Sequence, residues 1–75
     1  MKKIKDIRQH EIAYYFRVTQ PFISEIKRGN KSVTSNMAMQ LSEEFPEKTA
    51  RMWLKASYYE IQEAVWKSKY SEVAA

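Results

Sequence analysis

The chain has 75 residues, of which 44% are hydrophobic, and a net charge of +4; at this length about 60% of the unfolded surface is hidden, so we expect one domain over residues 1–75 with a thin core. The absence of Cys and the single His exclude a disulfide framework and a thiolate zinc site, and we expect no metal and no cofactor. Neither a signal peptide nor a run of about 20 apolar residues is present, which predicts no contact with a membrane and a cytoplasmic location, for a protein that is either bacterial or phage-encoded.

One Gly and two Pro interrupt the sequence, and period-two alternation is absent. This pattern predicts an all-α fold of four to five helices with short connections. The first clear helix begins near Gln9 and carries Ile12, Ala13 and Phe16 on one stripe. The segment before Gln9 has room for about two helical turns, and whether a helix precedes Gln9 stays open.

The second helix is bounded by clear signals at both ends. Thr19 is a good N-cap residue, and Pro21 lies in the first turn, where its missing N–H costs no hydrogen bond. Ile23 and Ile26 form the apolar stripe, and Gly29 ends the helix because a left-handed residue is favoured there.

Two further helical segments follow a polar loop. The third helix is predicted from Thr34 or Ser35 to about Phe45, before Pro46 breaks the pattern. Its inner stripe contains Met37, Ala38 and Leu41. Residues 47 to about 72 are helical again, either as one long helix or as two helices joined near Ser57. The apolar face of this segment contains Trp53, Leu54, Tyr58, Ile61 and Val65, and we expect Trp53 and Leu54 to lie in the core.

Residues 9–29 resemble a stretch found in a known protein family; their sequence is QHEIAYYFRVTQPFISEIKRG. From about Ile7 to Phe45 the chain resembles the helix-turn-helix repressor family of phage repressors, Cro proteins and many bacterial regulators, the XRE type. The resemblance implies a lambda-repressor-like domain whose helix at residues 19–28 reads the major groove. Relatives usually carry Gly at the turn position of Arg17, so Arg17 is expected in a left-handed conformation at a cost of about 1 kcal/mol.

The residues after Gly29 resemble the HigA-like antitoxins of the same family. The spacing of the Met37–Ala38 pair, the Trp53–Leu54 pair and the following tyrosines carries this similarity. It implies a possible toxin protein partner in addition to DNA.

Positive charge gathers in the first part of the chain. Residues 1–31 contain eight Lys or Arg and three acidic residues, whereas residues 32–75 are close to neutral. This distribution favours a polyanionic partner, and we expect duplex DNA. The predicted base contacts are Gln20, Phe22, Ser24, Glu25 and Arg28. The predicted phosphate contacts are Gln9, Arg17, Thr19, Lys27, Asn30, Lys31 and Ser32.

Several of these residues have a structural alternative. Phe22 is also consistent with a core position, and Gln20 with simple cover of the first turn. Glu25 is consistent with a surface ion pair to Arg28 or Lys27. The lysines at positions 2, 3 and 5 either form an arm along the DNA backbone or only solubilise the terminus.

A single helix reads few base pairs, and the resemblance implies a homodimer on a palindromic operator. The predicted dimer interface contains Tyr59, Ile61, Val65, Trp66 and Tyr70. The alternative is that these side chains complete the core of one chain.

Three classes of function are consistent with these features of the sequence. A DNA-binding transcriptional regulator, of the repressor type, is the first. The alternatives are a HigA-like antitoxin that also neutralises a toxin, and a protein-interaction module that does not bind DNA. An enzyme is not expected, because the sequence has no paired carboxylates with a partner base and no Gly-rich phosphate loop.

Overall fold

Five α-helices and one 3₁₀ turn make up residues 3–70, the part of the chain that this computed structural model describes. The elements in chain order are η1 (Ile4–Asp6), α1 (Gln9–Phe16), α2 (Gln20–Arg28), α3 (Ser35–Glu44), α4 (Ala50–Trp53) and α5 (Tyr58–Tyr70). Four of the α-helices have eight residues or more, and this range contains no strand. The all-α prediction is therefore confirmed.

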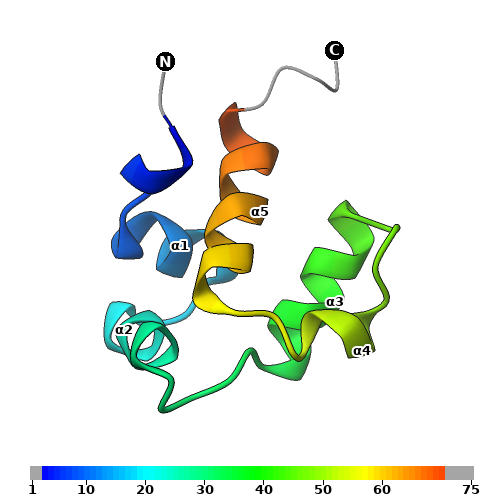
Figure 1. The fold of residues 1–75 in the computed structure, drawn as a ribbon, viewed down its shortest axis with the longest axis horizontal. Helices are drawn as coiled ribbons and strands as arrows, with labels where there is room; N and C mark the ends of the chain where they lie inside the picture. The colour runs from blue at the N-terminus through cyan, green and yellow to red at the C-terminus, as the bar shows by residue number, and fades with distance from the viewer. Residues whose placement is uncertain (1–2, 71–75) are drawn as a thin grey trace.

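The last helix occupies the middle of the structure. Figure 1 shows α5 between two groups of helices, with η1, α1 and α2 on one side and α3 and α4 on the other. α5 packs against η1, α1 and α2, so the last helix of the chain contacts its N-terminal part. A chain of this size needs such long-range contacts, because no pair of its helices can bury enough apolar surface alone.

Threonine side chains begin three of the helices. The hydroxyls of Thr19, Thr34 and Thr49 each accept a hydrogen bond from the backbone N–H three residues later, at 3.3, 3.2 and 3.3 Å. Each of these bonds satisfies one of the N–H groups that a helix start leaves free. The predicted boundaries of α1, α2 and α3 agree with the structure, and for α2 and α3 the reason is that these caps are local in sequence.

The apolar stripes of the helices meet in one core. The stripes predicted for α1, α2 and α3 are all buried, and Trp53, Tyr58, Ala64 and Val33 join them. Leu54 was expected beside Trp53 but is 38% exposed. It follows the last residue of α4, where the chain turns toward α5 and its side chain leaves the core.

The segment after Pro46 forms two helices. α4 ends at Trp53, and α5 begins after Ser57, whose backbone N–H donates to Glu60 Oε2 at 2.7 Å. The backbone N–H of Glu60 donates to Ser57 Oγ at 3.3 Å in return. This reciprocal pair is a capping box, which starts a new helix and breaks the continuous one.

A short turn precedes α1. η1 is followed by Ile7, which is only 2% exposed. The side-chain amide of Gln62 on α5 donates to the backbone oxygen of Ile7 at 3.0 Å. The N-terminal segment is therefore anchored on α5 without a full first helix.

Candidate nucleic-acid interface

The connection between α1 and α2 is a three-residue turn with one left-handed residue. Arg17 has φ 58° and ψ 42°, so the left-handed conformation predicted for this residue is confirmed. The backbone N–H of Val18 donates to the oxygen of Ala13 at 3.0 Å, which closes the end of α1. Thr19 then caps α2 directly, so the two helices are held against each other by a short, hydrogen-bonded link.

α2 has one buried side and one accessible side. Ile23 is fully buried and Ile26 is 6% exposed, so these residues fix the helix to the core. Gln20, Pro21 and Arg28 are exposed. The arrangement leaves polar side chains at both ends of the helix free to meet a ligand.

Three of the predicted base-contacting residues are only half accessible. Phe22 packs against the edge of the core, which agrees with the structural alternative for this residue. Ser24 and Glu25 have intermediate exposure. A DNA base would therefore have to lie close to the surface of α2 to contact these side chains.

Glu25 already has partners within the chain. Its Oε2 lies 3.2 Å from Arg28 Nη1, and its Oε1 accepts from Asn30 Nδ2 at 2.9 Å. The backbone N–H of Asn30 also donates to the backbone oxygen of Glu25 at 2.9 Å. Glu25 therefore organises the end of α2 and neutralises part of the charge of Arg28.

The predicted phosphate contacts lie at helix ends and in the loop after α2. Gln9 is the first residue of α1 and is half-buried, whereas Arg17, Lys27 and the loop residues 30–32 are exposed. Thr19 uses its hydroxyl as the cap of α2. Lys31 Nζ lies 5.9 Å from the centroid of the Phe22 ring, a cation–π distance that brings this ammonium group close to α2.

The predicted dimer surface requires a correction. Ile61 and Val65 are fully buried within the single chain, so they belong to its core and cannot contact a second copy. Their side chains point inward because α5 lies between two groups of helices (Figure 1). Tyr59 is 68% exposed and Trp66 is half-buried.

Tyr70 is also tied to its own chain. Its hydroxyl donates to Glu11 Oε2 at 2.5 Å, a bond that joins the end of α5 to α1. The part of the expected dimer surface that remains accessible is therefore centred on Tyr59 and Trp66.

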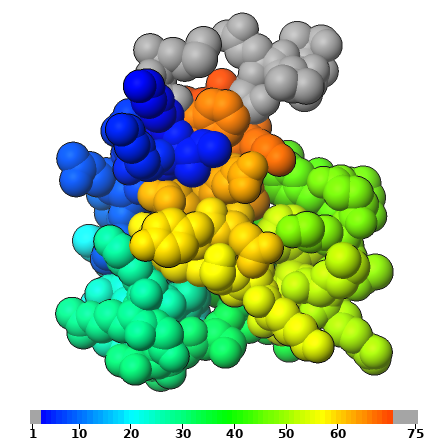
Figure 2. Space-filling view, in the orientation of Figure 1, coloured from blue at the N-terminus to red at the C-terminus, as the bar shows by residue number. Residues whose placement is uncertain are grey.

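A broad groove that the sequence did not predict lies beside α2. It has a volume of about 1170 Å³ and is bounded by η1, the start of α1, α2 and α5. Figure 2 shows the face where the N-terminal segment, α2 and the start of α5 come together. The described side chains that line the groove include four cations, Lys3, Lys5, Arg8 and Lys27, and one acid, Glu63.

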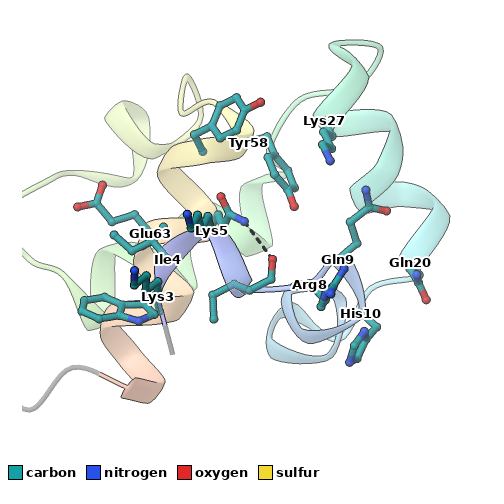
Figure 3. Close-up of a pocket in the computed structure, with 14 residues that line it drawn as sticks. Lys3, Ile4, Lys5, Arg8, Gln9, His10, Gln20, Lys27, Tyr58 and Glu63 are labelled. Atoms are coloured by element: carbon teal, nitrogen blue, oxygen red, sulfur yellow. Dashed lines mark hydrogen bonds between the residues drawn. The ribbon is translucent and has the colours of Figure 1, made fainter. Parts of the chain in front are cut away.

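Figure 3 shows how the labelled side chains are distributed around this groove. Arg8, Gln9, His10, Gln20 and Lys27 are drawn toward one end, and Lys3, Lys5 and Glu63 toward the other. His10 is exposed. The residues predicted for DNA contact thus share one end of the groove with a cation, Arg8, that was not predicted.

The groove also contains two adjacent tyrosines. Lys27 Nζ lies 5.5 Å from the centroid of the Tyr58 ring, and the Tyr58 and Tyr59 rings meet edge to face at 5.4 Å. Burial raises the pKa of the Tyr58 hydroxyl, and the neighbouring Tyr59 raises this pKa further. The phenol is therefore neutral at physiological pH and adds no negative charge beside Lys27.

Two kinds of feature, a metal-binding cluster and a membrane-spanning helix, are absent from the residues described. Residues 3–70 contain no group of three or more His, Asp or Glu side chains that could hold a metal ion. No helix between these limits is long and apolar enough to cross a membrane.

Comparisons with protein families, with curated proteins and with solved structures find no match to this chain.

Proposed function

We propose that this protein binds specific duplex DNA as a transcriptional regulator of the repressor type, with α2 lying in the major groove. The observation that carries the proposal is the two-sided character of α2. Ile23 and Ile26 anchor it in the core, while Gln20 and Arg28 are exposed at its two ends. The major groove is about 12 Å wide, which admits one helix presented in this way.

The chemistry of the exposed side chains suits base edges. The amide of Gln20 can pair with N6 and N7 of an adenine, and the Arg28 guanidinium can pair with O6 and N7 of a guanine. Ser24 and Phe22 add a hydroxyl and contact with a thymine methyl group. We assign Glu25 a positioning role, because Arg28 and Asn30 already occupy its carboxylate oxygens.

Contacts with phosphates come from cations and helix ends around α2. Lys27, Lys31 and Arg17 are exposed, and the start of α1 at Gln9 presents free backbone N–H groups. Binding through these groups releases counterions, so the affinity falls steeply with salt concentration. The excess of basic residues in positions 1–31 supports this part of the proposal.

A selection from a randomised duplex pool, followed by anisotropy titration of the enriched sequence at several salt concentrations, tests the proposal. Gln20→Ala should relax the preference for one base pair and cost about 1–3 kcal/mol on the selected site. Lys31→Ala should weaken all sequences alike and reduce the salt slope by about 0.9. Lys55→Gln, which removes an exposed charge from the loop between α4 and α5, serves as the control.

A protein partner is the second candidate. Met39 and Met52, on the neighbouring helices α3 and α4, are 55% and 53% exposed. Exposed apolar side chains of this kind are suited to a protein contact, including contact with a toxin. If the pool gives no enrichment and no duplex binds at low salt, DNA binding is contradicted and this candidate takes its place.

A further inference from the structure

The groove beside α2 combines an excess of positive charge with a fixed shape. Lys5, Arg8 and Lys27 reach it from three elements, η1, the residue before α1, and α2. All three side chains are exposed. The single acid among the described lining residues, Glu63, has its own partner, since its Oε2 lies 3.5 Å from Lys67 Nζ.

The backbone that carries Lys5 and Arg8 is anchored to the rest of the structure. Ile7, between Lys5 and Arg8, is buried and its backbone oxygen accepts from Gln62. The backbone N–H of Lys3 donates to Asp6 Oδ2 at 3.2 Å, which closes η1. Lys5 and Arg8 are therefore carried by an anchored segment that packs on α5, and binding a ligand there requires little ordering of the backbone.

We infer that this groove holds one phosphodiester strand of the bound duplex, with Lys5 and Arg8 joining Lys27 as phosphate contacts. The inference rests on the proposed function and extends it from α2 onto the N-terminal segment. A helix in the major groove is flanked by the two DNA backbones, and this groove runs along the flank of α2 that carries Gln20 and Lys27 (Figure 3).

The positive charge of the groove favours binding of a phosphodiester strand over binding of a second copy of the chain. A two-fold symmetric contact through the groove would bring the cations of both copies into one interface, with Glu63 as the single acid that each described lining supplies. Like charges at close range oppose such a contact, whereas closely spaced phosphates neutralise them. An acidic polypeptide shares the required charge, and a titration with poly-glutamate separates it from DNA.

The test compares Lys5→Gln/Arg8→Gln with wild type and with Lys55→Gln/Arg51→Gln, which removes two exposed charges outside the groove. On the selected duplex, the groove variant should lose about 1.8 from the salt slope and bind at least ~5-fold more weakly at 0.1 M salt. Its base preference should not change, and the control variant should behave as wild type. Unchanged thermal melting shows that each variant is folded.

Three results would overturn the inference. If the groove variant keeps the wild-type salt slope while Gln20→Ala still relaxes base preference, the groove is not a phosphate site but the proposed function stands. If wild type binds no duplex, both fail together. If NMR signals of Lys5, Arg8 and Gln62 move on adding a poly-glutamate peptide but not on adding the duplex, the groove binds an acidic polypeptide.

Discussion

Arg17 and Gly29 hold the same kind of backbone conformation with different side chains. Arg17 has φ 58° and Gly29 has φ 85°, a region in which a Cβ atom costs roughly 1–2 kcal/mol. Each residue follows a helix of the proposed DNA-binding unit. Arg17 adopts this conformation despite the cost, and its charged side chain is exposed close to α2.

Arg17→Gly is therefore expected to stabilise the fold. Removing the strain outweighs the greater entropy of Gly in the unfolded chain, and the gain should be about 0.5–1 kcal/mol. Gly29→Ala should have the opposite effect, about 1 kcal/mol, although a Cβ there meets nothing within 4 Å. Urea denaturation measures both values, and a less stable Arg17→Gly variant would contradict the interpretation.

The carboxylate of Glu60 makes stability depend on pH. The hydrogen bond from the Ser57 backbone N–H, and next the charge of Lys48, hold the pKa of Glu60 below its ordinary value of 4.5. A lowered folded pKa contributes stability above the ordinary value and loses it as pH falls through the folded value. Glu60→Gln should therefore flatten the loss of stability that occurs as pH falls below about 5, measured by urea denaturation at each pH.

At the scale of the element, each of the caps at Thr19, Thr34 and Thr49 starts a helix through one local bond. These bonds explain why the first residues of these helices can be predicted from short stretches of sequence. Thr19 differs from the other two because it also lies beside the exposed start of α2.

Thr19→Ala and Thr34→Ala should each destabilise the fold by about 1 kcal/mol. Only Thr19→Ala should also weaken binding to the selected duplex, measured by anisotropy under conditions where both variants are folded. Equal DNA affinity of the two variants would remove Thr19 from the predicted phosphate contacts and leave it a capping role.

At the scale of the whole molecule, side-chain amides connect distant segments. Gln62 binds the backbone of Ile7, and Gln40 donates to the backbone oxygen of Tyr15 at 3.0 Å. The first bond anchors the segment before α1 on α5, and the second ties the end of α1 to α3. The position of α1, and with it of α2, therefore depends on helices that follow much later in the chain.

Gln62→Leu keeps the volume of the side chain and leaves the buried Ile7 oxygen without this donor. We expect a loss of about 1–3 kcal/mol in the free energy of unfolding. Gln40→Leu should cost less, because the Tyr15 oxygen is only partly buried and water can replace the amide. The comparison is made by urea denaturation, and equal losses would show that burial does not decide the cost.

The homodimer predicted from the sequence is best tested on DNA, because Tyr59 and Trp66, the accessible part of the predicted dimer surface, line the groove assigned to a phosphodiester strand. On DNA, a dimer should protect two half-sites about 10 base pairs apart. A single protected half-site bound by one chain would contradict the dimer.

The sequence by itself determined the unit from Gln9 to Gly29. Its caps, its left-handed residues and its apolar stripes are set by interactions within a few residues, and the predicted boundaries of the two helices agree with the structure. Ser57 and Glu60 carried an equally local signal, the capping box that separates α4 from α5, although the periodicity of this segment left the break open.

Only the tertiary structure decided what covers each apolar face. Periodicity placed Ile61 and Val65 on one side of a helix, but two groups of helices bury that side within one chain. The groove beside α2 likewise depends on the bond between Gln62 and Ile7, which are 55 positions apart. A periodic pattern specifies the direction of a side chain on its helix, whereas its neighbour depends on how distant helices pack.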